Sequence, residues 1–227
     1  MSGLAMPWRD DRDLFQIARA ELSAAVIGDV MDKLGLYHQF LPQPIQPLER
    51  NMILAGRAMP VLEADLAPDS PPARPFGLML EALDSLQLDE VYITTGASPS
   101  YALWGELMSR RALRCGAAGA VLDGFSRDTR GILTTGFPVF SRGSYAQDQA
   151  PRGHVVDFRI AIEIEGVRIS PGDILFGDCD GVCVVPRSAE RDVFTAALEK
   201  ARAEKTVAKA LDAGMPAGDA FAKFGVL

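Results

Sequence analysis

Two short segments of this sequence hold the residues best suited to chemistry. Glu106 lies within residues 101–108, and the pair Arg127 and Asp128 follows an apolar run at 119–126. Arginine carries a permanent positive charge on a planar group that binds carboxylates at two points. An aspartate oxygen suits Mg²⁺, which usually takes one or two protein carboxylates and keeps several waters. Together with the second carboxylate of Glu106, these residues indicate a pocket for a small anionic oxo compound and a divalent cation.

The elements around these segments predict how they are positioned. The β-branched run at 91–95 predicts a buried strand, residues 103–113 have helical spacing that Gly116 would end, and residues 118–123 predict a second strand. A strand–helix–strand order implies a parallel pair with a right-handed crossover. Ligands bind outside the carboxyl ends of such strands, and a helix beginning near Gly105 would present unpaired backbone N–H groups there.

Taken alone, each of these residues also has a simpler interpretation. An adjacent Arg–Asp pair on a loop is most often a surface ion pair, and a glutamate near a helix start is often only a favourable partner of the helix dipole. Asp123-Gly124 is a common strand-ending turn, and Trp104 is better explained by packing than by substrate contact. Composition and spacing by themselves therefore support an α/β domain with an anion-binding rim.

The first third of the chain predicts helices followed by a proline-rich region. Residues 13–35 have helical spacing, with Ser23 placed to cap a second helix and Gly35 to end it. Eight prolines between 36 and 76 predict loops and short strands. Within this region, residues 53–61 look extended and Pro68 to Pro75 look like an exposed connection. Helical spacing resumes at 77–87.

The remainder of the chain is rich in predicted strands. These lie at 139–140, 155–164, 167–169, 174–176 and 182–185, separated by Gly and Pro turns. A long C-terminal helix is expected at 188–213, capped by Ser188 and ended by Gly214. We expect one α/β domain over residues 1–227, with helices at 13–35, a variable region at 36–76 and a core at 77–186.

The composition is that of a soluble protein and excludes several classes. The net charge of −7 argues against a nucleic-acid binder. No apolar run approaches the roughly 18 residues of a membrane span, and residues 1–4 do not begin a secretory signal. Three cysteines (Cys115, Cys179 and Cys183) and two histidines do not make a disulfide framework or a zinc site. We expect buried thiols and a cytoplasmic location.

The spacing of the chemical residues resembles a known family signature. Glu106, twenty intervening residues, then Arg127-Asp128 is similar to the acidic-X20-Arg-Asp signature of the RraA-like family, which includes metal-dependent 4-hydroxy-4-methyl-2-oxoglutarate aldolases. Further matches lie at 116–124, 138–140, 171–173, 177–178, 180–182 and 202–205. Two features depart from the usual pattern: the signature acid is Glu rather than Asp, and the proline-rich region looks longer.

The resemblance implies a fold, an assembly and a set of roles. The fold would be a swivelling β/β/α-type domain with a mixed sheet core, flanking helices and a long C-terminal helix, assembled as a homotrimer or a hexamer with active sites between subunits. Asp128 would bind Mg²⁺ or Mn²⁺ directly, Arg127 would bind a 2-oxo acid, and Glu106 would hold a metal-bound water. The backbone amides of Gly105, Glu106, Leu107 and Met108 would hold the carboxylate. Glu204 of a neighbouring subunit would bind the metal through water.

The activity implied is cleavage of a 4-hydroxy-2-oxo acid to pyruvate through a metal-stabilised enolate, with oxaloacetate decarboxylation as a side reaction. The alternative is a non-catalytic regulator that binds a ribonuclease, as some RraA-like proteins do. Those regulators lack the aspartate after the arginine, so Asp128 favours the enzyme. A phosphohistidine-type swivelling domain would need a loop histidine, for which only His154 is remotely placed. A methyltransferase would need a glycine-rich cofactor loop after an early strand, and the sequence has no such loop there.

Overall fold

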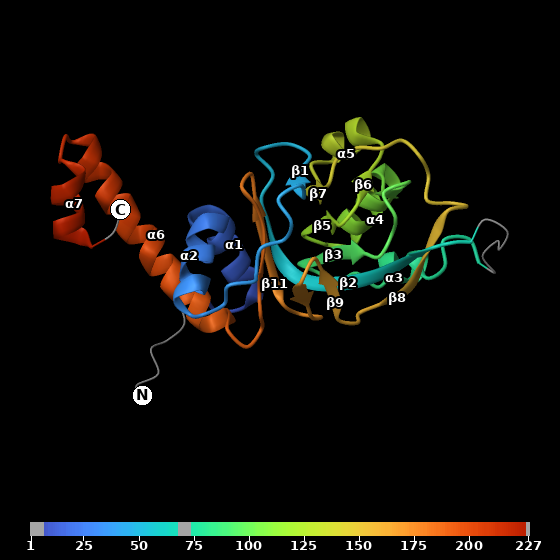
Figure 1. Ribbon diagram of the computed structural model, residues 1–227, viewed down its shortest axis with the longest axis horizontal. Helices are drawn as coiled ribbons and strands as arrows, with labels where there is room; N and C mark the ends of the chain where they lie inside the picture. The colour runs from blue at the N-terminus through green and yellow to red at the C-terminus, as the bar shows by residue number, and fades with distance from the viewer. Residues whose placement is uncertain (1–6, 68–73, 226–227) are drawn as a thin grey trace.

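A mixed eight-stranded sheet forms the centre of the protein. The computed structural model describes residues 7–67 and 74–225, and Figure 1 shows the sheet between two groups of helices. The strand order is β1 (Gln46–Pro47), β7 (Val139–Ser141), β5 (Gly119–Leu122), β3 (Glu90–Thr95), β2 (Leu54–Asp65), β11 (Ile174–Asp178) and β12 (Gly181–Val185), with β8 (Gly153–Phe158) also paired to β2.

Strand β2 is the longest strand and joins the parallel and antiparallel parts of the sheet. It runs parallel to β3 along one side, while on its other side β11 pairs with residues 54–57 and β8 pairs with residues 61–65. Pro60 lies where the antiparallel partner changes from β11 to β8, a position at which a strand tolerates the missing N–H. The predicted extended segment 53–61 is thus confirmed, but it continues to Asp65 and is central. The expectation of only short strands within 36–76 was wrong.

The predicted strand–helix–strand unit is confirmed with one change. Strands β3 and β5 are parallel, and α4 (Glu106–Cys115) connects them and ends at Gly116 in the left-handed conformation. Leu103 and Trp104, expected to begin the helix, instead belong to the short strand β4 (Ala102–Trp104). All three β4 side chains are buried, so burial on every side overrides their helical spacing. Helices α3 (Met79–Asp84) and α5 (Thr129–Thr135) lie with α4 on this face of the sheet.

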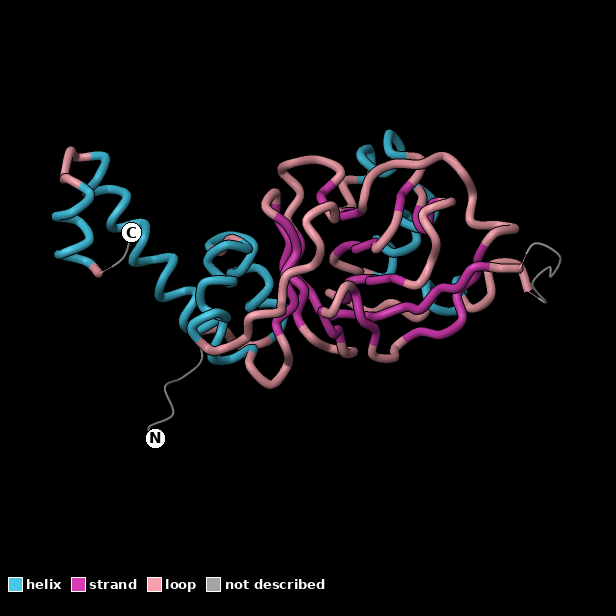
Figure 2. The backbone as a smooth tube through the Cα atoms, viewed as in Figure 1, coloured by secondary structure: helices cyan, strands magenta, loops and turns pink. Residues whose placement is uncertain are grey.

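A second group of helices packs against β11 and β12 at the other end of the sheet. It consists of α1 (Asp11–Glu21), α2 (Ala24–Lys33) and α6 (Glu190–Asp212), which share one apolar cluster with those strands. The Ser23 hydroxyl accepts a hydrogen bond from the N–H of Val26 at 3.3 Å, so the predicted cap of the second helix is confirmed. Figure 2 shows these cyan helices beside the magenta strands.

The predicted strand at 155–164 is two separate strands. β8 ends at Phe158, Arg159 takes a positive φ of 58°, and β9 (Ile162–Ile164) then pairs with β10 (Val167–Ile169). Glu165 and Gly166 form the tight turn of this hairpin with φ values of 46° and 85°, as predicted. The β9–β10 hairpin packs its apolar side chains over the sheet in a second cluster.

The C-terminal helix departs from prediction at its start. α6 begins at Glu190, its N-cap is Ala189 and no side chain caps it, so the role predicted for Ser188 was wrong. Gly214 follows the helix with φ of 92°, as expected for its stop. A further helix, α7 (Ala217–Phe224), was not predicted. In Figure 1 the end of α6 and α7 extend away from the sheet.

None of the described helices is both long and apolar enough to cross a membrane. Residues 68–73 of the predicted exposed connection from Pro68 to Pro75 lie outside the described residues.

Candidate active site

A two-stranded parallel ribbon brings the two chemical segments together. Strand β4 pairs with β6 (Phe125–Ser126), which places Trp104 opposite Ser126. The N–H of Arg127 donates to the Trp104 carbonyl at 2.8 Å, extending the pairing by one residue. Helix α4 follows β4 directly, and Arg127 and Asp128 follow β6. The structure thus brings Gly105, Leu107 and Met108 together with Arg127 and Asp128, through a ribbon whose strands follow β3 and β5 in the chain.

The start of α4 offers backbone donors to this site. Its N-cap is Gly105, which has extended backbone and makes no side-chain capping hydrogen bond. The first N–H groups of a helix have no partner within the helix and carry part of the positive end of its dipole. The N–H of Glu106 approaches Asp128 Oδ2 at 3.4 Å, a long contact. This helix start is thus suited to hold a carboxylate.

Asp128 has a left-handed backbone conformation at the start of α5. Its φ of 58° lies in the left-handed region, which is uncommon for residues other than glycine, asparagine and aspartate. Its side chain is about half exposed, at 48%. Gly105 leaves room for it, because a Cβ at position 105 would lie 2.7 Å from Asp128 Oδ2. The backbone therefore holds an accessible carboxylate against the first turn of α4.

Arg127 is flanked by two carboxylates. Its Nε lies 3.9 Å from Asp128 Oδ2, and its Nη2 lies 3.3 Å from Asp148 Oδ1. Asp148 comes from the loop between β7 and β8 and was not predicted, because no local pattern marks it. These two contacts hold the guanidinium at the cavity while leaving its side chain 38% exposed.

Arg127 and Asp128 line a cavity of about 280 Å³. Its polar lining comes from Arg127, Asp128, Asp148 and Gln149, and its apolar lining from Phe76, Met79, Leu80, Leu83, Ala102, Leu103, Trp104, Gly105, Leu107 and Met108. The predicted carboxylate-binding residues Gly105, Leu107 and Met108 are therefore in the wall of the same cavity as Arg127. Trp104 is 1% exposed between Tyr92 and Phe137, which confirms its packing role.

Glu106 faces a second, shallower hollow beside the cavity. Its Oε1 accepts from Arg110 Nε at 2.8 Å, and its carboxylate lies against Gly131, where a Cβ would force the Glu106 side chain to shift. Glu106 and Asp128 both line this hollow of about 560 Å³, together with Arg110, Thr129, Arg130, Gly131 and Thr134. Asp128 thus lines both the apolar cavity and the hollow that contains the Glu106 carboxylate.

A buried polar cluster lies behind the cavity wall and was also missed. Glu63 on β2 is 2% exposed and accepts hydrogen bonds from Gln149 Nε2 and, at 3.3 Å, from Thr94 Oγ1. Burial raises the pKa of Glu63 to about 8. The Tyr92 hydroxyl is buried with no hydrogen-bond partner in the part of the chain that the structure describes. Because Gln149 also lines the cavity, Glu63 supports its wall.

Glu204 does not approach this site within one chain. It lies on α6, where it is paired with Lys200 at 2.5 Å, and Lys200 also reaches Asp29 on α2 at 2.7 Å. Figure 1 places α6 on the far side of the sheet from α4. A role for Glu204 at the site therefore requires a second copy of the chain.

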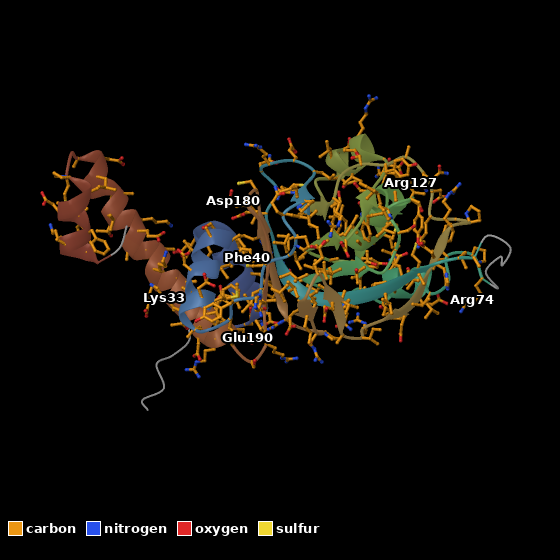
Figure 3. All side chains as sticks on the ribbon, in the orientation of Figure 1. Lys33, Phe40, Arg74, Arg127, Asp180 and Glu190 are labelled. Atoms are coloured by element: carbon orange, nitrogen blue, oxygen red, sulfur yellow. The ribbon has the colours of Figure 1, made fainter. Side chains whose placement is uncertain are left out.

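Another acidic group in the described residues lies elsewhere. Asp178, Cys179 and Asp180 have ligand atoms within 4.8 Å of one another at the turn between β11 and β12. Asp178 Oδ2 accepts from the N–H of Ala24 at 2.8 Å and Oδ1 from the N–H of Asp180 at 2.9 Å, so both oxygens hold the backbone. In Figure 3 Asp180 lies well apart from Arg127. Cys179 is exposed and Cys115 is partly exposed, so buried thiols were correctly predicted only for Cys183.

The fold and sequence together define the family. Residues 24–184 match the model of the RraA-like family described as Aldolase/RraA, and the chain belongs to this family. The chain is 30% identical over 174 residues to the "Putative 4-hydroxy-4-methyl-2-oxoglutarate aldolase" of Halalkalibacterium halodurans, covering 77% of each chain. It is 28% identical over 193 residues to protein DlpA of Legionella pneumophila; these are 85% of this chain but only 31% of DlpA.

Solved structures confirm the predicted fold class. Streptomyces coelicolor RraAS2, described as an unusual member of the RNase ES inhibitor RraA protein family, superposes with a TM-score of 0.75 at 23% identity over 88% of this chain and 98% of that one. A structure described as that of novel cellulases from microbes associated with the gut ecosystem superposes with a TM-score of 0.79 at 31% identity over 91% of each chain. The mixed α/β fold with flanking and C-terminal helices is thus that of RraA-family proteins.

Proposed function

We propose that this protein is a divalent-metal-dependent lyase that cleaves a 4-hydroxy-2-oxo acid to pyruvate, and that it also decarboxylates oxaloacetate. The observation that carries the proposal is the meeting of Arg127, Asp128 and the start of α4 at one cavity. A cation, an accessible carboxylate and unpaired backbone donors are the groups that binding a 2-oxo acid beside a divalent cation requires.

The residues at this site fit a divalent cation. Asp128 presents a half-exposed carboxylate, and the missing Cβ of Gly105 leaves space beside its Oδ2. Asp128 would be the direct ligand, within the one or two protein carboxylates typical of Mg²⁺. Glu106 lines the same hollow as Asp128 and would hold a metal-bound water. Mn²⁺ accepts the same oxygen ligands. When bound, such a cation would polarise the 2-oxo group and stabilise negative charge that develops there.

The side chains of this chain then have separate roles. Arg127, oriented by Asp148 and Asp128, binds the 2-oxo acid and offsets charge on the 2-oxo oxygen as the C3–C4 bond breaks. The backbone N–H groups of residues 105–108 hold the carboxylate. Glu106, with Arg110 on Oε1, holds the water that removes the proton of the 4-hydroxyl. The electron pair left on the 4-oxygen forms the C=O of a second, carbonyl product. The electron pair of the broken C3–C4 bond passes to C3, which takes up the proton removed from the hydroxyl to give pyruvate.

Decarboxylation of oxaloacetate needs the same groups. Loss of CO₂ from oxaloacetate also leaves an electron pair on C3 of pyruvate, so the same charge stabilisation by Arg127 applies. This reaction requires no proton removal from a 4-hydroxyl. It therefore separates the role proposed for Arg127 and Asp128 from the role proposed for Glu106.

The proposal includes an assembly of several copies. The end of α6 extends away from the body of the protein, and Glu204 on that helix is 35% exposed at its side chain. We propose that a neighbouring copy of α6 brings Glu204 to the metal through water, in a homotrimer or a hexamer. Light scattering on the purified protein measures the mass of the assembly, and a monomer would contradict this part of the proposal.

The experiment that tests the function is an assay of pyruvate release. Oxaloacetate and a panel of 4-hydroxy-2-oxo acids are offered with Mg²⁺, with Mn²⁺ and with a chelator. We expect metal-dependent pyruvate release that the chelator abolishes and added metal restores. Folded protein that releases no pyruvate with either metal would contradict the enzyme and favour the alternative, a regulator that binds a ribonuclease.

A further inference from the structure

The loop between β7 and β8 is tied to the sheet on both sides of Asp148. On one side, the Gln147 carbonyl accepts a hydrogen bond from the N–H of Ala102 at 2.8 Å, which ties the loop to β4. On the other side, Gln149 Nε2 donates to Glu63 Oε2, which ties the loop to β2. Asp148 therefore lies between two anchored neighbours.

Asp148 depends on these two ties for its position at Arg127. Its Oδ1 lies 3.3 Å from Arg127 Nη2, but its side chain is 41% exposed. Packing does not fix a side chain that is this exposed, so the backbone on either side decides where the carboxylate lies. Loss of one tie would let Asp148 move, and with it the guanidinium that it contacts.

The tie from Gln149 to Glu63 is buried inside the chain. Gln149 and Glu63 are 3% and 2% exposed, and Thr94, which donates to the other oxygen of Glu63, is fully buried. A neighbouring copy could cover the cavity, but it could not reach these atoms. The contact therefore belongs to the single chain, whatever an assembly adds at the cavity.

The oxygens of Glu63 hold neutral groups. Thr94 and Gln149 are uncharged, and two ionisable groups, the phenols of Tyr92 and Tyr101, interact with the charge of Glu63. Burial raises the pKa of both phenols, so they are uncharged as well. Burying a carboxyl group is costly unless its oxygens make hydrogen bonds. One of the two bonds that Glu63 makes is the tie to the loop.

We infer that Glu63 is a positioning residue for the reaction at Arg127: through Gln149 it fixes the loop on which Asp148 orients the guanidinium. This inference rests on the proposed function and adds to it a residue that contacts neither substrate nor metal. It makes ligand affinity at the cavity depend on a hydrogen bond buried behind the cavity wall.

The test compares ligand affinity in variants of this one hydrogen bond. Calorimetry measures the binding of oxalate in the presence of Mg²⁺, because oxalate presents a carboxylate beside further oxygens as a 2-oxo acid does. Glu63→Met and Gln149→Met each remove one end of the bond with a side chain of similar length. We expect each to weaken oxalate binding at least about fivefold. Wild-type affinity in both variants would overturn the inference.

Glu63→Gln is the conservative variant that should restore binding. Burial raises the pKa of Glu63 to about 8, so at about pH 7 the side chain is uncharged, as an amide is. The amide keeps an oxygen that accepts from Gln149, and we expect oxalate affinity within about twofold of that of the wild-type protein. A loss as large as that of Glu63→Met would overturn the inference, because the contact with Gln149 would then not be what matters.

The double variant Glu63→Met/Gln149→Met separates positioning from stability. Each single substitution removes the partner of a buried polar atom and should lower the free energy of unfolding, whereas the double substitution removes both atoms. We expect the double variant to be more stable than either single variant, yet to bind oxalate as weakly. Recovery of affinity together with stability would overturn the inference, because the bond would then serve folding alone.

Ile169→Ala is the matched control for stability. Ile169 is fully buried in the cluster beneath the β9–β10 hairpin, so its truncation destabilises the fold without removing a tie of the loop. We expect this variant to bind oxalate as the wild-type protein does. A loss of affinity equal to that of Glu63→Met would overturn the inference, because any loss of stability would then have the same effect.

A second cycle tests the route through Asp148. Asp148→Asn removes the charge that orients Arg127. In that background we expect Glu63→Met to change oxalate affinity by less than about twofold, because both substitutions act through the same contact. An equal loss in both backgrounds would show that Glu63 acts by another route and would overturn the inference.

Turnover separates this inference from the proposed function. Pyruvate release from oxaloacetate and from 4-hydroxy-2-oxo acids is measured for the same variants. Metal-dependent release that is equal in the wild-type protein, Glu63→Met and Gln149→Met would leave the lyase standing and overturn the role of Glu63. The expected pattern of oxalate affinities without pyruvate release from any of these acids would support the role of Glu63 and contradict the lyase.

Discussion

Because Gly105 has no Cβ, the Asp128 carboxylate can lie against the backbone of residue 105. A Cβ on residue 105 would lie 2.7 Å from Asp128 Oδ2, closer than atoms in contact normally approach. The same glycine is the N-cap of α4, and Gly105, Leu107 and Met108 line the cavity. The glycine thus sets both the position of the carboxylate and the exposure of the helix start.

Gly105→Ala should therefore impair the site without unfolding the protein. The φ of −147° suits alanine, so the expected effect is displacement of the Asp128 side chain. We expect kcat/KM for pyruvate release to fall at least about tenfold, or about 1.4 kcal/mol in activation free energy. Gly218→Ala on α7 is the control, because a Cβ there meets no atom within 4 Å. Equal activities of the two variants would contradict the dependence of Asp128 on Gly105.

Arg127→Lys should weaken substrate binding although it keeps the charge. Lysine lacks the planar fork that reaches Asp148 and a carboxylate at once. We expect KM for the 2-oxo acid to rise about tenfold or more, with a smaller change in thermal stability. Arg114→Lys, on the exposed last turn of α4, should leave KM unchanged. Steady-state kinetics of both variants check this, and an unchanged KM for Arg127→Lys would remove Arg127 from substrate binding.

Glu63 should make the stability of the protein fall as pH rises. Burial raises its pKa from the ordinary 4.5 to about 8, so between these values the folded protein holds a proton that the unfolded chain lacks. The stabilisation is complete below pH 4.5 and is lost as pH rises through about 8, with a slope of up to about 1.4 kcal/mol per pH unit. Denaturant unfolding across this range measures the slope.

Glu63→Gln should remove this contribution to the slope, because an amide of the same shape does not titrate. We expect the variant to be more stable than the wild-type protein at about pH 8 and nearer to it at about pH 5. Glu163→Gln, on the exposed face of β9, is the matched control and should keep the wild-type slope. Parallel pH profiles for the wild-type protein and the Glu63 variant would contradict this role of Glu63.

Ser109→Ala should destabilise the protein through Trp104. The buried indole Nε1 donates to Ser109 Oγ at 2.7 Å, and the substitution leaves that donor without a partner. We expect a loss of about 1–3 kcal/mol in the free energy of unfolding. Ser98→Ala, where the hydroxyl is exposed, should change stability by less than about 0.5 kcal/mol. A loss no larger than that of the control would show that the hydrogen bond is dispensable.

The sequence predicted which residues lie near one another better than it predicted the elements that carry them. Arg127, Asp128 and residues 105–108 were found from residue type, spacing and a family resemblance, and Arg127 and Asp128 line one cavity with Gly105, Leu107 and Met108. Leu103 and Trp104 were assigned to a helix because the spacing of a short apolar segment does not separate a strand from a helix. Their partner, β6, is only two residues long, which is too short to leave a pattern.

Other parts of the site depend on contacts between distant segments. Asp148 and Gln149 reach the cavity from a loop, and Glu63 lies 86 residues from the Gln149 that contacts it. No periodicity marks such residues, because their role arises from tertiary packing. Similarly, β2 was underestimated because the prolines of residues 36–76 suggested loops, whereas Pro60, the one proline of β2, lies where the strand changes partners. Cys179 is exposed because it lies in the tight turn between β11 and β12. The cysteine itself does not predict that turn.

The central claim is that Asp128 makes pyruvate release depend on a divalent cation. Asparagine tolerates the left-handed backbone that position 128 requires, so Asp128→Asn removes the charge and little else. The decisive measurement is the rate of pyruvate release from oxaloacetate against Mg²⁺ concentration, for the wild-type protein and for Asp128→Asn. The account predicts saturable activation of the wild-type protein and a loss of at least about 100-fold in the variant, with its fold and assembly intact. Activation of the variant equal to that of the wild-type protein would contradict the account.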